Sequence, residues 1–240
     1  MAYTHEQMLE KMQAASQDMN TFYQQAFVNY QGFEKGSELS PGKGAKKSKG
    51  LAYSEDIAEF LLSNPDVLDG ISVPAGVTGY RTESHNGVTD NPDSNRAEER
   101  IALGMFGNTY EHIGYVFDYQ TPLTNLRTDR HVGKIDLLSR TDDEIWLLEL
   151  KKFDSEETLL CCILEAYTCL RRVDAAKLKS DFELDASKPL QAGILVFRDQ
   201  DQHESYKKPD TAVRRLMTAL DVHIFVLAKE NKEYLVGMAD

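Results

Sequence analysis

The sequence has few cysteines and lacks the patterns in which cysteine usually acts. The three cysteines, Cys161, Cys162 and Cys169, fall in one short stretch, form no CxxC pair and have no histidine at zinc-ligand spacing. We therefore expect free, partly buried thiols in a reducing compartment and no catalytic thiol. A chain of 240 residues can bury a real core without disulfides or structural metals.

Long apolar runs and an excess of positive charge are also absent. No run approaches the roughly 20 apolar residues that span a bilayer, and Met1 to Lys11 lack an apolar signal region. These absences predict a cytoplasmic protein without a membrane partner. The formal net charge of −12 argues against a general nucleic-acid coat. It leaves open an enzyme that contacts nucleic acid through one local patch.

The composition and the hydrophobic pattern divide the chain into two predicted parts. Residues 1–50 begin with an amphipathic helix over Thr4–Tyr30, opened by a capping box of Thr4 and Gln7, and continue in a segment rich in Gly and Lys. Residues 51–240 are predicted to form the main domain, with a core over about 95–227. The first helix is expected either to pack on that domain or to form a homodimer, and the sequence does not choose.

The second part alternates between helical and extended patterns. Ser54 is the expected N-cap of its first helix and Ser155 that of its longest one. This order predicts an α/β fold with a mixed central sheet flanked by helices, without the glycine motifs of nucleotide-binding folds. The expected helices cover 53–63, 95–106, 156–172 and 210–220, and the expected strands cover 115–122, 133–139, 144–150, 191–197, 222–227 and 234–238.

Three charged residues interrupt two of the apolar strands. Asp136 lies inside the strand GKIDLLS, while Glu149 and Lys151 lie near the end of EIWLLELK. Residues two apart in a strand share a face, so Glu149 and Lys151 point the same way. A hairpin turning at 141–143 would place Asp136 opposite them. Buried charges are costly unless they are paired or used, so we expect a functional cluster here.

The chemistry of this trio favours phosphodiester hydrolysis. Two carboxylates suit Mg²⁺ or Mn²⁺, which prefer hard oxygen ligands. Such an ion can polarise a phosphodiester. A neighbouring ammonium can orient the attacking water or stabilise the charged transition state.

The motifs GKIDLL and Glu149-Leu150-Lys151, with an aspartate and an ExK pair on adjacent strands, resemble the PD-(D/E)XK nuclease superfamily and its restriction-endonuclease-like fold. The resemblance covers about 95–227. It implies that Asp136 and Glu149 bind the divalent metal, that the Leu150 carbonyl helps, and that Lys151 is the catalytic lysine.

The resemblance also implies an accessory glutamate on the preceding helix, either Glu98 or Glu99. Glu98 is preferred because Ile101, three residues on, is apolar and turns that face inward. The chain departs from the QxxxY motif of many exonuclease-like relatives, since Ile163 stands four residues before Tyr167. Glu157 or Glu165 would then replace the glutamine in positioning DNA or metal.

Two basic segments are candidates for contacts with the phosphates of a nucleic acid. One comprises Lys43, Lys46, Lys47 and Lys49, and the other is Arg171 with Arg172 after the longest helix. Each segment also has a simple structural explanation. The lysines are explained by a solvated linker, and the two arginines by a helix C-terminus, which favours cations.

The sequence thus predicts a Mg²⁺-dependent nuclease with DNA as its expected substrate. The alternatives are a catalytically silent module of the same fold that binds nucleic acid or a protein partner, and a structural protein that assembles through its N-terminal helix.

Overall fold

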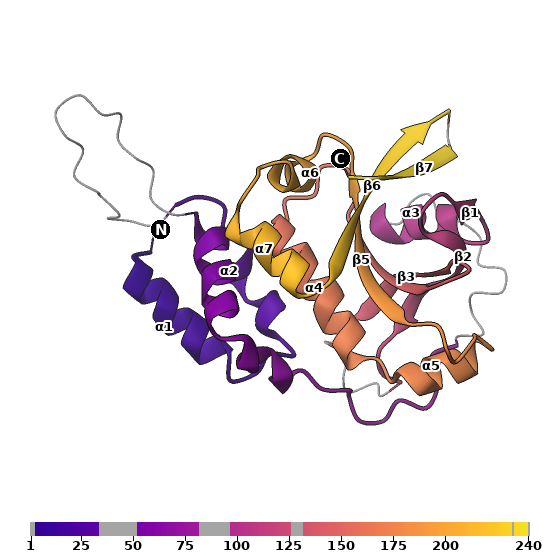
Figure 1. Cartoon of the computed structure of the whole chain (residues 1–240), viewed down its shortest axis with the longest axis horizontal. Helices are drawn as coiled ribbons and strands as arrows, with labels where there is room; N and C mark the ends of the chain where they lie inside the picture. The colour runs from indigo at the N-terminus through magenta and orange to yellow at the C-terminus, as the bar shows by residue number, and fades with distance from the viewer. Residues whose placement is uncertain (1–2, 34–51, 82–96, 126–131, 232, 240) are drawn as a thin grey trace.

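The computed structural model describes residues 3–33, 52–81, 97–125, 132–231 and 233–239 (Figure 1). Seven strands form one sheet in which every strand pairs with its neighbours in chain order. The ladder is antiparallel from β1 to β4, parallel from β4 to β6, and antiparallel again at β7. The predicted α/β class with a mixed sheet is confirmed. The strands are β1 Thr109–Tyr110, β2 Gly114–Pro122, β3 Lys134–Arg140, β4 Ile145–Leu150, β5 Leu190–Phe197, β6 Val222–Glu230 and β7 Glu233–Met238.

Helices cover both faces of this sheet. α4 and α7 pack on one face, and α1 and α2 form a further layer beyond them, while α3 packs on the opposite face (Figure 1). None of the helices in the described ranges is long and apolar enough to cross a membrane. The helices are α1 His5–Ala15, α2 Tyr53–Ser63, α3 Ala97–Met105, α4 Leu159–Arg172, α5 Ala175–Asp181, α6 Asp201–Tyr206 and α7 Ala212–Ala219, with 3-10 helices η1 Phe22–Gln24, η2 Ala26–Asn29 and η3 Pro65–Gly70.

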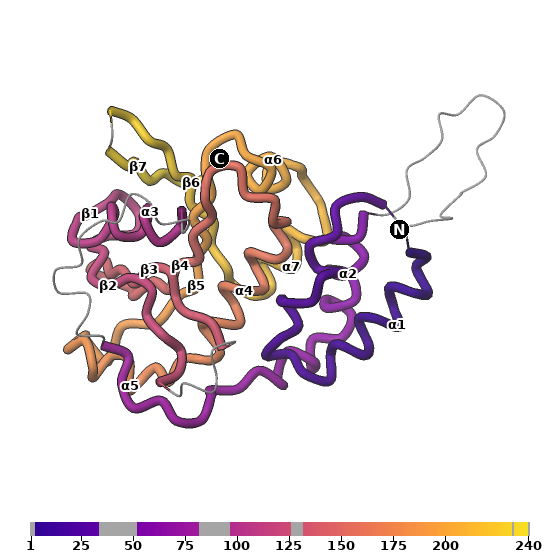
Figure 2. Tube along the Cα trace, turned by 180° about the vertical axis from the view of Figure 1, so that it is seen from behind, coloured from indigo at the N-terminus to yellow at the C-terminus, as the bar shows by residue number. Residues whose placement is uncertain are grey.

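The N-terminal segment shares the core of the sheet domain. Met8 and Phe22 are buried in the same apolar cluster as Leu160 of α4 and Ile194 of β5. Burial of apolar surface is the main favourable term in folding, so this cluster ties the N-terminal segment to α4. The tube view shows the same arrangement from behind, with α2 beside α4 and α7 and with α1 on the outer side of α2 (Figure 2).

Local hydrogen bonds explain why the first helix is shorter than predicted. The capping box of Thr4 and Gln7 is present, but the expected helix over Thr4–Tyr30 is wrong beyond Ala15. The Asp18 carboxylate accepts hydrogen bonds from Asn20 N and Thr21 Oγ1. Such a side-chain turn competes with helix continuation, and two 3-10 helices follow.

Two predicted N-caps are also wrong. α2 begins after Ala52, which offers no side-chain cap, so Ser54 is not its N-cap. α4 begins at Leu159 instead of near Glu156, because the Thr158 side chain accepts from Cys161 N and caps it in place of Ser155. The short elements β1, α5 and α6 were not predicted, since each is too brief to show a clear period.

Candidate active site

A tight hairpin brings the predicted catalytic strands together. Thr141 N donates to the Glu144 carbonyl at 3.0 Å, and the Thr141 hydroxyl accepts from Asp143 N and Glu144 N. The antiparallel register pairs Leu137 of β3 with Leu148 of β4. Asp136 therefore lies across from Glu149, as the length of the turn predicted.

Protein donors hold both oxygens of the Asp136 carboxylate. Leu150 N donates to Oδ2 at 2.9 Å, and Gln120 Nε2 donates to Oδ1 at 2.6 Å. Gln120 belongs to β2 and has a φ of 49°, a left-handed conformation that is uncommon for residues other than glycine. Strained backbone of this kind is concentrated at functional sites.

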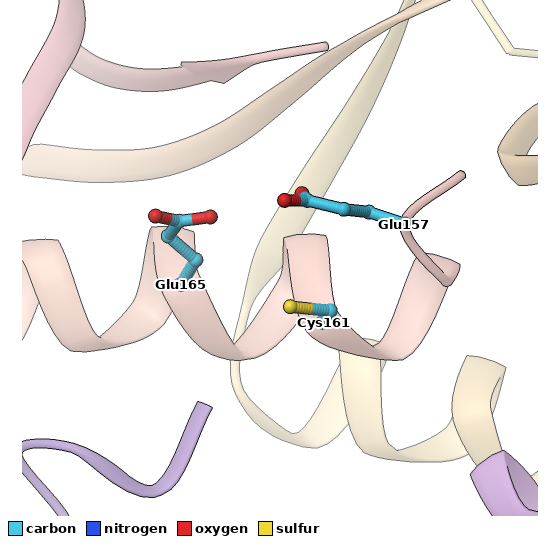
Figure 3. Close-up of side chains that lie close together, drawn as sticks. All are labelled: Glu157, Cys161 and Glu165. Atoms are coloured by element: carbon cyan, nitrogen blue, oxygen red, sulfur yellow. The ribbon is translucent and has the colours of Figure 1, made fainter. Parts of the chain in front are cut away.

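Lys151 is buried and lies at the centre of a cluster of carboxylates, of which Glu149 is buried and Glu157 and Glu165 are partly exposed. Its residue is only 3% exposed. Its Nζ is 2.6 Å from Glu149 Oε1, 2.5 Å from Glu157 Oε2 and 3.0 Å from Glu165 Oε2. Glu149 reaches it from β4, Glu157 from the β4–α4 loop, and Glu165 from α4. Figure 3 shows the carboxylates of Glu157 and Glu165 on the same side of α4.

The cluster carries more negative than positive groups. Burial raises the pKa of Asp136 to about 6, although Lys151 opposes the shift. Burial, followed by repulsion from Asp136 and Glu165, also raises the pKa of Glu149 well above its ordinary value. Burial alone would lower the pKa of Lys151, but Glu149 and Glu165 more than offset this and raise it. The lysine is therefore charged, and one ammonium is shared among several carboxylates.

The loop that carries Glu157 is held from two sides. On one side, Gln202 of α6 is 1% exposed and its Nε2 donates to the carbonyls of Ser155 and Glu157. On the other, Thr158 N donates at 3.0 Å to Oδ1 of Asn29, the last residue of η2. The N-terminal segment thus helps to fix the geometry around Lys151.

The structure places Leu150 and the two predicted alternatives for the accessory acid, Glu98 and Glu99, near the end of β4 or on α3. Glu98 Oε1 accepts from Lys152 N at 3.2 Å, so this glutamate lies at the end of β4 beside the cluster. Glu99 lies near Tyr119, whose pKa is raised by burial and then by this glutamate. Leu150 is fully buried in the apolar cluster that includes Ile101 of α3.

The predicted nucleic-acid contacts are only partly described. Lys43, Lys46, Lys47 and Lys49 lie outside the described residues. Arg172 is 6% exposed and its Nη1 donates to the Val132 carbonyl at 3.0 Å, whereas Arg171 is exposed at the end of α4. Of the two arginines, only Arg171 presents its side chain to solvent.

Sequence reasoning missed two residues near the cluster. Gln120 gives no motif, because its role depends on the pairing of β2 with β3. Tyr23 of η1 is buried close enough for Glu165 and Glu149 to add to the rise in its pKa, which burial mainly causes. By contrast, the spacing of four between Glu157, Cys161 and Glu165 indicates a common helix face and could have grouped them.

In the part of the chain that the structure describes, two sets of side chains have potential metal-ligand atoms within 4.8 Å of one another: Glu157 with Cys161 and Glu165, and Asp199 with His203 and Glu204. In the first, burial raises the pKa of the Cys161 thiol, which keeps it protonated, and Lys151 contacts both carboxylates. In the second, His203 Nδ1 accepts from Asp199 N, and Lys207 pairs with both acids. Lysine ammonium groups therefore already contact both clusters.

The three cysteines are free and buried, as predicted. Comparison with family models found no match, and comparisons with curated proteins and with solved structures found none either. The function is therefore argued from the geometry of the site.

Proposed function

We propose that the protein is a Mg²⁺-dependent nuclease that hydrolyses phosphodiester bonds of DNA. The observation that supports this most is the excess of carboxylates around Lys151. Glu149, Glu157 and Glu165 all contact its single ammonium, and the Asp136 carboxylate lies near enough for that charge to act on its pKa. Buried like charges disfavour one another, and a divalent cation would relieve the repulsion. Buried charges without compensation destabilise a fold, so an excess of carboxylates is not explained by stability.

The donor set fits a hard cation. Asp136 and Glu149 are oxygen ligands on adjacent strands, and Gln120 and Leu150 N fix the orientation of the Asp136 carboxylate. Mg²⁺ is commonly held by one or two carboxylates together with substrate phosphate. When bound, the ion would polarise the phosphodiester and stabilise the charge that develops on it.

The chain's own residues supply the remaining chemistry. Lys151 keeps its proton because Glu149 and Glu165 favour the charged form, so it acts as a cation that can hold a phosphate oxygen or orient the attacking water. Glu165 and Glu157 fix the Lys151 ammonium between them before substrate arrives. Glu98 lies at the strand end as the accessory acid.

The test is cleavage of plasmid and single-stranded DNA with Mg²⁺ or Mn²⁺. We expect Glu149→Gln and Lys151→Ala to lower the rate by at least about a thousandfold, because charge stabilisation of this kind contributes several kcal/mol. Glu144→Gln, at the other end of β4, is the matched control and should retain the rate. If the wild type and the two site variants cleave alike, the proposal is wrong.

A catalytically silent nucleic-acid or protein-binding module of the same fold is the second candidate. It is favoured by Ile163, which is fully buried where exonuclease-like relatives carry glutamine, and by the net charge of −12. Calorimetric titration with Mg²⁺ and Mn²⁺ separates the two. Heat of binding that disappears in Glu149→Gln supports the nuclease, and its absence in the wild type supports the silent module.

A further inference from the structure

A hollow lies against the loop that carries Glu157. Its volume is about 890 Å³, towards the upper end of the range for ligand pockets. We name it the tyrosine hollow, and its defining residues are three tyrosines and three carboxylates: Tyr3, Tyr30, Tyr53, Asp154, Glu156 and Asp201. Asp154 and Glu156 precede Glu157 in the chain, so the hollow adjoins the proposed active site.

The tyrosines form a rigid aromatic wall. The rings of Tyr3 and Tyr30 are parallel within 3°, with centroids 5.4 Å apart, and Tyr53 meets both edge-on. Lys11 Nζ lies 4.9 Å from the centroid of Tyr3. Tyr30 borders both this hollow and a second one that Glu157 also lines. Tyr30 is therefore the ring best placed to stack with a ligand that approaches Lys151.

The polar side chains that line the hollow differ in whether they are already hydrogen-bonded within the protein. Gln31 Nε2 donates to the Glu156 carbonyl, and Gln200 Oε1 accepts from Asp154 N, so these amides hold the wall in place. The side chains of Asp154, Glu156 and Asp201 have no hydrogen-bond or ion-pair partner within the described ranges. The lining contains no Lys or Arg. The hollow therefore offers aromatic surface and hydrogen-bond acceptors, and it disfavours phosphate.

We propose that the tyrosine hollow binds an unpaired nucleobase that carries an exocyclic amino group, next to the phosphodiester held at Lys151. The inference rests on the proposed function for its nucleic-acid substrate. Bases splayed out of a single strand stack on aromatic side chains and are read at their edges. Carboxylates accept hydrogen bonds from the exocyclic amino group of cytosine. Thymine has no amino group and can donate only its N3–H, beside two carbonyl oxygens that carboxylates repel. The substrate is then a single strand or an unpaired end, with cytosine preferred over thymine.

The experiment measures binding of the oligonucleotides dC12 and dT12 to the full-length Glu149→Gln chain in EDTA, by fluorescence anisotropy. Cleavage and metal binding are thereby excluded from the measurement. We expect dC12 to bind about tenfold more tightly than dT12. Tyr30→Leu should weaken dC12 binding about tenfold, because it removes a stacking surface. Tyr30→Phe keeps the ring and should bind as the parent does.

Two matched controls test the assignment to this hollow. The triple variant Asp154→Asn/Glu156→Gln/Asp201→Asn should bind dC12 and dT12 about equally. The control variant Glu10→Gln/Asp66→Asn/Asp69→Asn removes three exposed charges elsewhere and should keep the preference for dC12. Tyr115→Leu, at an exposed tyrosine of β2, should not weaken binding.

Equal binding of dC12 and dT12, or no effect of Tyr30→Leu, would overturn the inference. If spermidine displaces the bound oligonucleotide and dC12 and dT12 bind equally, the inference is also overturned. That result would indicate an organic cation as the ligand of the hollow. The inference and the proposed function fail separately. If dC12 is preferred but the wild type cuts no DNA with Mg²⁺, base binding in the hollow is supported and the nuclease proposal is wrong. If the wild type cuts DNA but shows no preference between dC12 and dT12, the nuclease proposal is supported and the inference about the hollow is wrong.

Discussion

The two faces of β4 are both buried, yet one is entirely apolar and the other ends in charged side chains. On the face towards α3, Trp146, Leu148 and Leu150 join one apolar cluster. On the face towards α4, Leu147 is apolar and packs against Cys169, but Glu149 and Lys151 follow it on the same face and lie among further carboxylates. Packing on the first face stabilises the fold directly, whereas charges on the second are desolvated at a cost that their pairing must offset. A strand that tolerates such a cost on one face alone indicates function on that face.

The largest expected effect comes from removing the shared cation. Lys151→Met should lower the free energy of unfolding by about 3–5 kcal/mol, because it leaves buried carboxylates without a counter-charge. Urea denaturation measures the loss. The double variant Glu149→Gln/Lys151→Met should be more stable than the single one. If both are equally unstable, charge imbalance is not the cause.

The apolar face is tested by a cavity on the same strand. Leu148 is 1% exposed, and Leu148→Ala should cost about 2–5 kcal/mol. Because Leu148 points away from the carboxylates, cleavage per folded molecule should be retained at a temperature where the variant is folded. A thousandfold loss of specific activity there would show that the two faces are not independent.

Metal should offset the pH dependence of the charged face. A carboxyl group whose pKa is about 6 when folded and 3.8 when unfolded keeps its proton longer in the folded state. Stability should therefore fall as pH rises from about 4 to 6, by at most about 1.4 kcal/mol per pH unit for this group. Mg²⁺ at a hundred times its Kd should add about 2.7 kcal/mol at neutral pH.

Thermal unfolding at several pH values, with and without Mg²⁺, checks both expectations. Asp136→Asn should flatten the pH dependence and remove the stabilisation by Mg²⁺. An unchanged Mg²⁺ effect in this variant would place the metal elsewhere.

The smallest effect compares two helix caps, of which only that of Thr158 also donates its hydroxyl to the N-terminal segment, at the Val28 carbonyl. Thr158 caps α4 and Thr211 caps α7, each by accepting a backbone N–H at 3.2 Å. Changing either threonine to alanine should cost about 1 kcal/mol. Only Thr158→Ala should also slow cleavage, because Thr158 anchors the loop of Glu157. Equal activity in the two variants would show that the loop needs no such anchor.

Much of the candidate site could be predicted from the local hydrophobic pattern of the sequence. The alternation in 133–139 and 144–150 and the turn between them are sufficient to place Asp136 opposite Glu149, since the period of a strand fixes which residues share a face. The cap of α4 was not predictable in this way, because Ser155 and Thr158 are both good N-caps and only tertiary contacts with Asn29 and Gln202 decide between them.

The sequence by itself determined the α/β class, the hairpin of β3 and β4 and the convergence of two carboxylates and a lysine, because these depend on periodicity over a few residues. The tertiary structure alone decided that Glu157 and Glu165 share Lys151, that Gln120 orients Asp136, and that the N-terminal tyrosines border the site. Those contacts join residues far apart in the chain, and long-range packing, which leaves no period in the sequence, brings them together.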